Sequence, residues 1–246
     1  MSRHNAILKV KQFNYAVKRK LWPNAPAPKA HYKSLAEAAA QPGWCVLHAG
    51  GGRNKHNLFQ QQHVRRINVD LDAVTLAQDR TAGLRVLGNL EELPVPDNAF
   101  DLIVCEMVFE HLAHPGRVVR EFFRSLKSGG SLIFITPNLL AYPFLISRAT
   151  PFWFHRLYGF LRGRQAEDIF PTYYRLNTGA AIRRHFDRAG FELVQLRQLD
   201  ASCDYFDILP GLHQMLAVVT NFLNRVEALS FLRQFHLGWF RKPAAG

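Results

Sequence analysis

The 246-residue sequence is 48% hydrophobic and 20% charged, a composition that is typical of a globular chain with a hydrophobic core and excludes intrinsic disorder. Its length suits one α/β domain with insertions, and the absence of a repeat at a fixed period excludes a solenoid. The formal net charge of +12 at pH 7 favours anionic partners, with a solvated basic surface as the plainer alternative.

The positive charge lies in the two flanks of the chain. Residues 1–40 contain eight Lys/Arg and one acid, residues 44–138 contain ten of each, and residues 139–246 contain thirteen Lys/Arg and eight acids. We therefore expect a neutral central part between basic flanks that suit lipid headgroups, nucleic acid or an acidic glycan.

The cysteines and the apolar segments bear on localisation. Cys45, Cys105 and Cys203 are far apart and odd in number, so they form no disulfide framework and favour a reducing compartment. The basic N-terminus lacks the apolar stretch of a secretory signal, and the apolar segment 139–161 is interrupted by two prolines and an arginine. We expect a cytoplasmic protein that is soluble or peripheral at the membrane.

The first 43 residues are predicted to form a basic helical extension. An apolar residue recurs at helical spacing among lysines and arginines, at Val10, Phe13, Val17 and Leu21. This amphipathic helix should end at Pro23, and a proline-containing linker over 24–29 should lead to an alanine-rich helix over 32–40.

Residues 44–138 alternate short apolar runs with helical patterns. Strands are predicted over 44–49, 64–70, 84–87, 101–105 and 131–136, and helices over 73–80 and 115–126. This order requires right-handed crossovers, which predicts an α/β fold with a mainly parallel sheet and helices on both faces.

Residues 139–177 interrupt the alternation with aromatic residues and arginines, which predicts an insertion or lid over the sheet edge. Such side chains suit stacking on flat or sugar rings, pairing with an anion or contact with a membrane interface; the alternative is that the rings pack into their own domain.

Residues 178–246 should complete a single domain with a helix over 178–189 and strands over 191–199 and 235–241. A helical stripe in this part, predicted as core or dimer contact, consists of Leu212, Met215, Val219, Phe222, Val226 and Leu229.

A glycine turn follows the first predicted strand, at Gly50, Gly51 and Gly52. Glycines there let the backbone approach a ligand without a Cβ in the way, although tight turns favour glycine without any ligand. Asp70 ends the second predicted strand, where its carboxylate can accept hydrogen bonds from ribose hydroxyls. The third glycine of a G-x-G-x-x-G pattern would fall on Lys55, so the loop suits a cofactor without a pyrophosphate.

A longer pattern lies between residues 85 and 138. It consists of Leu93, Pro94, Asp97, Phe100, Asp101, Glu110, His111, Lys127, Gly129, Gly130, Thr136, Pro137 and Asn138. With these residues the chain resembles the class I S-adenosylmethionine-dependent methyltransferases, in the methyltransferase type 11 group that includes enzymes of ubiquinone and menaquinone biosynthesis. The resemblance covers residues 44–138 and, more loosely, 168–199, and it implies a Rossmann-like, doubly wound, seven-stranded sheet with S-adenosyl-L-methionine as cofactor.

The resemblance also implies roles for residues of this chain. Those that would bind the cofactor are His48, Ala49, Gly50, Gly51 and Gly52 at the methionine and ribose part, Asp70 at the ribose, Leu71 against the adenine, Asn89 and Leu90 at the adenine edge, and Glu106 and Met107 along the pocket.

Three residues depart from the family pattern. Asn54 replaces a third glycine, and Asn89 replaces an aspartate that accepts a hydrogen bond from the adenine amino group. The amide oxygen of an asparagine can still accept that hydrogen bond. His48 replaces the acid that holds the methionine ammonium; a neutral imidazole could accept from that ammonium, whereas a protonated one would repel it. The sequence thus leaves open both an active enzyme and a chain that has lost catalysis.

Methyl transfer needs alignment of the acceptor in a site sheltered from water, because the sulfonium already carries an activated methyl group. A base is needed only when the acceptor must lose a proton; His111 is the candidate, with a loop-fixing histidine as the alternative. Glu110, His111 and His114 could be pictured as metal ligands, but no Cys or His set at zinc spacing completes them, so no metal is predicted.

We predict methylation of a small, lipid-linked or glycan-type acceptor, most simply at oxygen. The oligomeric state does not follow from the sequence. The alternatives are an RNA methyltransferase that uses the basic flanks and an inactive binding or scaffold protein. Nucleic acid is the less favoured partner, because no RNA-binding module is recognisable. Peripheral membrane contact through the N-terminal helix is a further expectation.

Overall fold

A computed structural model describes residues 3–144 and 170–244, and its internal contacts divide the chain into two compact units. The sheet unit comprises Lys29–Pro137, Thr172–Arg197 and His236–Gly246, and the helical unit comprises Met1–Pro28, Asn138–Pro171 and Gln198–Phe235. Most of the predicted insertion over 139–177 lies outside the described residues.

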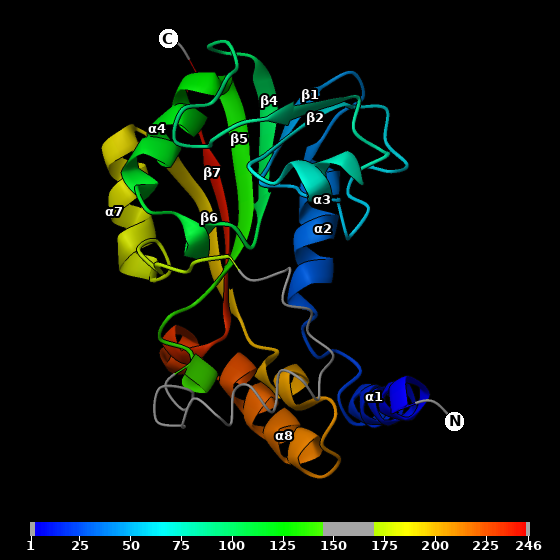
Figure 1. Cartoon of the computed structure of the whole chain (residues 1–246). Helices are drawn as coiled ribbons and strands as arrows, with labels where there is room; N and C mark the ends of the chain where they lie inside the picture. Colours follow the sequence, from blue (N-terminus) through cyan, green and yellow to red (C-terminus); the bar gives the residue numbers. More distant parts are fainter. Residues whose placement is uncertain (1–2, 145–169, 245–246) are drawn as a thin grey trace. The chain divides into compact units, whose positions relative to one another are not determined.

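Seven strands form one sheet in the order β3-β2-β1-β4-β5-β7-β6 (Figure 1). They are β1 (Cys45–Ala49), β2 (Arg65–Asp70), β3 (Leu84–Leu87), β4 (Phe100–Glu106), β5 (Leu126–Pro137), β6 (Glu192–Leu199) and β7 (Phe235–Arg241). The four pairings among β1 to β5 are parallel. β7 runs antiparallel to β5, because Asn138 bonds to Gln234 at one end and Gly129 bonds to Lys242 at the other. The predicted α/β class with a mainly parallel sheet is confirmed.

The helices flank this sheet or lie in the helical unit. They are α1 (Arg3–Leu21), α2 (Pro28–Ala39), α3 (Ala73–Ala77), α4 (Pro115–Ser125), α7 (Gly179–Ala189) and α8 (Leu212–Arg225), with the short 3-10 helices η1 (Phe109–His111), η3 (Ser202–Phe206) and η4 (Glu227–Leu232). In Figure 1, α4 and α7 lie together on one face of the sheet, with α2 and α3 on the other. No helix of the described residues is long and apolar enough to cross a membrane.

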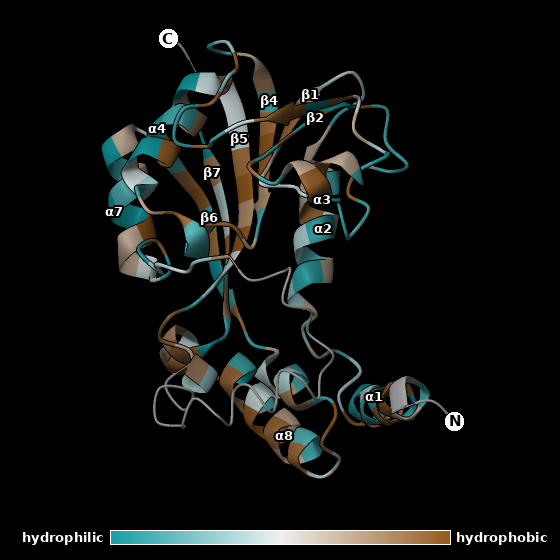
Figure 2. Ribbon diagram, viewed as in Figure 1, coloured by the Kyte–Doolittle hydropathy of each residue, from teal (hydrophilic) through white to brown (hydrophobic). Residues whose placement is uncertain are grey.

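The hydrophobic core lies against the central strands, which carry the hydrophobic colour in Figure 2. Under α4 and α7, the ring of Phe186 packs between two strand residues, with centroid separations of 5.6 Å to Phe134 and 4.2 Å to Phe240. On the opposite face, Tyr32 and Ala36 of α2 are fully buried. These layers fix the carboxyl ends of β1, β2 and β4, where the candidate site lies.

Three elements differ in extent from their predictions. The helix predicted over 32–40 begins already at Pro28, a residue that suits the first turn of a helix. The helix predicted over 73–80 ends at Ala77, because Asp79 turns inward to bind the side chain of Arg66. The strand predicted over 131–136 begins already at Leu126, which pairs with Phe100 before the register shifts.

Both long helices of the helical unit bury polar residues. α1 buries Asn14, which donates to the Asp207 carbonyl at 2.8 Å, and Lys18, which lies 2.7 Å from Asp204. α8 buries His213, Ala217, Thr220 and Leu223. The predicted core role of the stripe from Leu212 to Leu229 is therefore wrong for its central residues: Met215, Val219 and Phe222 are 59%, 39% and 55% exposed.

Candidate active site

The glycine turn after β1 is built so tightly that side chains would not fit. Gly50 has a φ of +64°, and a Cβ there would lie 2.5 Å from Cγ2 of Val108. A Cβ on Gly51 would lie 2.5 Å from Cγ of His48 and 2.6 Å from Oδ1 of Asn68. The close approach at Gly51, and not only a turn preference, therefore requires glycine.

Asn54 occupies the position of the missing third glycine in a backbone conformation that glycine favours. Its φ is 51°, in the left-handed region that asparagine tolerates better than most residues. Its side chain accepts a hydrogen bond from the Leu58 N–H at 3.0 Å and donates to Thr81 Oγ1 at 3.0 Å. Asn54 thus holds the left-handed conformation that the loop adopts at this position.

His48 lies buried at the end of β1 beside a buried ion pair. Arg66 donates to both oxygens of Asp79, at 2.7 and 3.0 Å, and its Nη1 also lies 3.3 Å from Nδ1 of His48. Burial, and then the charge of Arg66, lower the pKa of His48 to about 4. His48 is therefore neutral at pH 7, and because a guanidinium only donates, Nδ1 accepts and the proton lies on Nε2.

The tautomer of His48 bears directly on the departure noted in the sequence. An imidazole with its acceptor nitrogen engaged by Arg66 has only an N–H left to offer, so it does not replace the missing acid as an acceptor for an ammonium group. Asn68 extends the same network, since its amide donates to Asp79 and to the carbonyl of Gly52, both at 2.8 Å.

Asp70 ends β2 next to the glycine turn. One of its oxygens accepts from the N–H of Gly52 at 2.7 Å, and the other accepts from the N–H of Asp72 at 2.9 Å. Each oxygen retains a second lone pair for a further donor. Leu71 follows with 67% of its surface exposed, which leaves an open apolar surface beside the carboxylate.

Glu106 supplies a carboxylate at the end of β4. His56 Nδ1 lies 2.9 Å from the Glu106 carboxylate, and Nζ of Lys29 lies 3.5 Å from the same carboxylate. Burial alone would raise the pKa of Glu106, but the hydrogen bond from His56 and the charge of Lys29 outweigh it and hold that pKa below its ordinary value. Met107 follows with a φ of 55°, a strained conformation typical of functional sites.

A cleft of about 180 Å³ joins these groups beside the glycine turn. Its lining comprises Lys29, His48, Gly50, Gly51, Asn54, Lys55, His56, Glu106 and Met107. The structure thus brings together five of the predicted cofactor residues: His48, Gly50, Gly51, Glu106 and Met107. Sequence reasoning missed Lys29, Lys55 and His56, which lie in segments without a recognisable motif.

The remaining predicted residues lie outside that lining. Ala49 and Gly52 are sequence neighbours of lining residues, and Asp70 accepts a hydrogen bond from the N–H of Gly52. Asn89 is exposed, and its side-chain oxygen accepts from the Glu91 N–H at 2.9 Å. The side chain of Leu90 is buried in the core. The adenine roles of Leu71, Asn89 and Leu90 remain predictions.

His111 lies in η1, just beyond the carboxyl end of β4. Its Nε2 is 3.9 Å from Oε1 of Glu110, whose carboxyl is buried beside Thr136 and has its pKa raised by burial. His111 is outside the lining of the cleft, so its role as a base remains a prediction.

A different group of side chains with metal-ligand atoms lies in the helical unit. Cys203, Asp204 and His213 place one ligand atom each within 4.8 Å of one another. The charge of Lys18, 2.7 Å from Asp204, already neutralises the one carboxylate of this group. It gives no reason to change the prediction that the protein holds no metal.

Comparison with known proteins agrees with this geometry. Residues 47–134 match a family model described as a methyltransferase domain. A probable S-adenosylmethionine-dependent methyltransferase of Mycolicibacterium smegmatis is 38% identical over 166 residues, which cover 66% of this chain and 56% of the relative. A ubiquinone/menaquinone biosynthesis C-methyltransferase of Vibrio cholerae is 28% identical over 109 residues, 39% of this chain and 42% of the relative. The chain spans about half the length of these relatives.

Solved structures show the same fold at low identity. The [4+2]-cyclase SpnF superposes with a TM-score of 0.58 at 16% identity, covering 87% of this chain and 82% of its own. Geranyl diphosphate C-methyltransferase from Streptomyces coelicolor gives 0.54 at 15% identity, covering 87% and 77%. Since one of the two is named a cyclase, the fold does not fix the reaction.

The sheet order and the glycine turn beside two strand-end carboxylates define the class I methyltransferase architecture. Residues 47–134 thus match a methyltransferase domain, and the chain is similar to a probable S-adenosylmethionine-dependent methyltransferase over 66% of its length.

Proposed function

We propose that the protein binds S-adenosylmethionine at the cleft between Gly51 and Glu106 and transfers its methyl group to an acceptor. The observation that supports this most is the largely buried carboxylate of Glu106, which lies in a cleft that also contains Lys29, Lys55 and His56. An amino-acid end carries an ammonium and a carboxylate, and this lining offers a partner for each.

The residues of the chain have separate tasks in this proposal. Glu106 accepts from the methionine ammonium in place of the family acid that His48 replaces. Lys29, Lys55 and His56 are available for the methionine carboxylate, and Asp70 accepts from the ribose hydroxyls over the open surface by Leu71. S-adenosylmethionine supplies the activated methyl group when bound. The protein contributes orientation of the acceptor and exclusion of water.

For the acceptor, we propose a small, lipid-linked or glycan-type molecule methylated at oxygen, with His111 as the base. The support is the position of His111 after β4, partly exposed beside Glu110. Some relatives are named C-methyltransferases, so the methylated atom must be identified from the product. Mass spectrometry should find a methylated species in cells that express the protein, and NMR of that species should show which atom carries the methyl group. A new carbon–methyl bond would reject the oxygen proposal.

The cofactor proposal is tested by calorimetric titration with S-adenosylhomocysteine. Asp70→Ala should weaken binding at least tenfold, whereas Asp187→Ala, an exposed acid on α7, should leave it unchanged. If the unmodified protein fails to bind S-adenosylmethionine and S-adenosylhomocysteine at micromolar concentrations, the chain is a methyltransferase-like binding protein and the enzymatic proposal is wrong.

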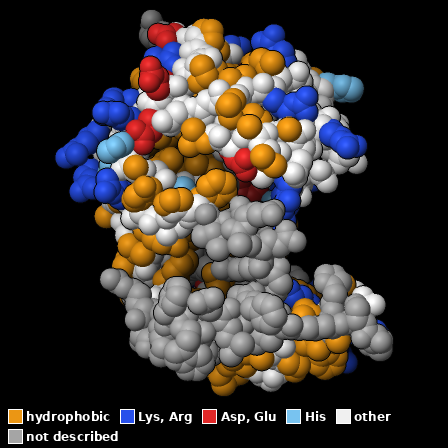
Figure 3. Space-filling view, viewed as in Figure 1, with side chains coloured by type: hydrophobic (Ala, Val, Ile, Leu, Met, Phe, Trp, Pro, Cys, Tyr) orange, Lys and Arg blue, Asp and Glu red, His pale blue; other side chains and the backbone are white. Residues whose placement is uncertain are grey.

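A second proposal concerns peripheral contact with an anionic membrane through the helical unit. Both of its long helices expose apolar residues: Phe13 and Leu21 of α1 are 58% and 55% exposed, and Figure 3 shows hydrophobic side chains gathered over α8. The last turn of α1 adds Lys18, Arg19 and Lys20, two of them exposed. Apolar insertion and basic residues together favour anionic lipid.

Vesicle sedimentation tests the membrane proposal. The protein should sediment with vesicles that contain anionic lipid and much less with neutral ones. Phe222→Ser with Met215→Ser should abolish sedimentation, whereas Val194→Ser, an exposed apolar residue of β6, should not. Equal sedimentation of both variants would reject this surface.

A further inference from the structure

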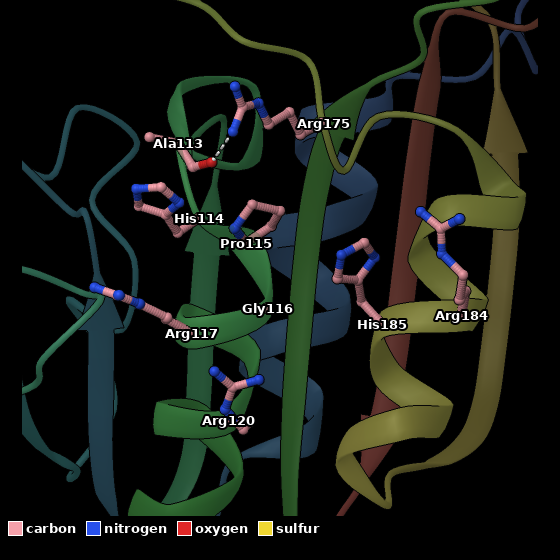
Figure 4. A pocket seen from close by; sticks show the side chains of 9 residues that line it. All are labelled: Ala113, His114, Pro115, Gly116, Arg117, Arg120, Arg175, Arg184 and His185. Atoms are coloured by element: carbon pink, nitrogen blue, oxygen red, sulfur yellow. Dashed lines mark hydrogen bonds between the residues drawn. The ribbon is translucent and has the colours of Figure 1, made fainter.

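A second hollow of the sheet unit lies between the start of α4 and helix α7, and none of its lining residues is acidic. It has a volume of about 550 Å³ and is lined by Ala113, His114, Pro115, Gly116, Arg117, Arg120, Arg175, Arg184 and His185 (Figure 4). In Figure 3 a group of Lys, Arg and His side chains marks this side of the molecule. The hollow shares no residue with the cleft at Glu106.

Two elements and one loop supply the cations. α4 begins at Pro115 and contributes Arg117 and Arg120, and its positive N-terminal end faces the same hollow. α7 contributes Arg184 and His185 from consecutive positions, which Figure 4 shows opposite α4.

Arg175 closes the hollow from the loop before α7 and is held in place. Its Nη1 donates to the carbonyl of Ala113 at 2.7 Å, and its guanidinium lies 5.6 Å from the ring centroid of Tyr173. The other N–H groups along the edge of a guanidinium fixed in this way remain available to a ligand.

Side chains from the two helices meet over Gly116. A Cβ built on Gly116 would lie 3.7 Å from Nη1 of Arg120 and 3.7 Å from Cδ2 of His185. The guanidinium of α4 and the imidazole of α7 therefore converge over the backbone of the first helical turn. Nδ1 of His185 lies 2.9 Å from the carbonyl of Ala181 and donates to it, which leaves Nε2 for other contacts.

The charges of this hollow are poorly balanced. Arg117 has a carboxylate partner, Glu91, at 3.9 Å. Within residues 3–144 and 170–244, Arg120 and Arg184 form no salt bridge. Like charges held together at a helix N-terminus repel one another, and a multiply charged anion would remove that repulsion.

We propose that this basic hollow is a binding site for a phosphate or diphosphate group. Several arginines that line one hollow suit the tetrahedral oxygens of a phosphoryl group, which can accept from two guanidinium groups and a helix N-terminus at once. A single concave site also differs from the extended basic track that a nucleic acid would need. The proposal does not depend on methyl transfer.

Calorimetric titration with inorganic pyrophosphate tests the site. The protein should bind pyrophosphate with a submillimolar Kd, and Arg120→Gln with Arg184→Gln should weaken binding at least tenfold. Arg188→Gln, an exposed arginine of α7 outside the hollow, should change it less than twofold. Thermal melts should match for all variants, because the replaced side chains are exposed.

Two further arms distinguish the source of the phosphate. If the ligand is a lipid headgroup, vesicles of phosphatidic acid should bind and lose binding in the double variant; if it is a free metabolite, glycerol phosphate should bind and the vesicles should not. Binding of S-adenosylhomocysteine should be equal in all variants, which separates this site from the proposed active site. Equal pyrophosphate binding by the protein and the double variant, or binding of an RNA oligonucleotide without binding of pyrophosphate, would overturn the proposal.

Discussion

Nη1 of Arg66 lies 3.3 Å from Nδ1 of His48 while the same guanidinium forms a bidentate pair with Asp79. The family acid is thus replaced by a neutral histidine held under the glycine turn. In the proposed site the acid for the cofactor ammonium is Glu106, on a different strand.

This arrangement predicts which change affects which end of the cofactor. Glu106→Gln should weaken the binding of S-adenosylhomocysteine roughly 10- to 100-fold, because one charge-assisted hydrogen bond is lost. The same variant should leave the binding of methylthioadenosine unchanged, because that compound lacks the amino-acid end. Asp70→Ala should weaken the binding of both ligands. Titrations of both variants with both ligands decide the matter, and equal losses for the two ligands in Glu106→Gln would contradict the assignment.

The buried ion pair predicts a large loss of stability on removal of one partner. Asp79→Asn leaves Arg66 charged in the core and should lower the free energy of unfolding by about 3–5 kcal/mol. Asp187→Asn on the surface of α7 is the matched control and should have little effect. Urea denaturation measures both, and a small change in Asp79→Asn would mean that water reaches Arg66.

Two buried histidines predict a loss of stability in mild acid. Burial, assisted at His48 by Arg66, lowers the pKa of His48 and of His236 to about 4. Between about pH 6.5 and 4 the unfolded chain therefore binds more protons than the folded one, so stability is fully present above pH 6.5 and falls as the pH drops.

Each histidine should account for on the order of 2–3 kcal/mol at pH 4. Urea denaturation at pH 7.5, 6 and 5 measures the slope, and His236→Asn should reduce it. A free energy of unfolding that is constant over this range would show that neither group is buried in its neutral form.

The contacts of Gly51 predict that alanine is not tolerated there. Its Cβ would overlap His48 and Asn68, so Gly51→Ala should cost about 1–3 kcal/mol of stability and displace the lining of the cleft. Gly83→Ala serves as the control, since its Cβ would only reach ordinary contact, 3.4 Å from the carbonyl oxygen of Arg66. Thermal melts and S-adenosylhomocysteine titration compare them; wild-type affinity in Gly51→Ala would mean that the turn is not part of the site.

The strands and the glycine turn could be predicted because their signals are local. An apolar run that ends at Gly50 or Asp70 predicts both a strand and the residue at which the strand ends. From the sequence, Glu106 could be assigned only to the lining of the pocket. Its partners are His56, in a loop 50 residues away, and Lys29, at the start of α2 and 77 residues away.

The orientation of the two helices in the helical unit could not be predicted. Hydrophobic periodicity indicates that a helix has two faces, but not which one is covered. In α1 the buried face is set by Lys18 and Asn14, whose partners Asp204 and Asp207 lie more than 180 residues further along the chain. The same holds for α8, where the stripe with Phe222 remains on the surface.

The strand order has a consequence for the way the protein is made. β6 is synthesised before β7, yet β7 lies between β6 and β5. On the ribosome β6 therefore has no neighbour to pair with until residues 235–241 have emerged. During that interval the nascent chain exposes one edge of β5 and both edges of β6, so aggregation competes most strongly with folding at this stage.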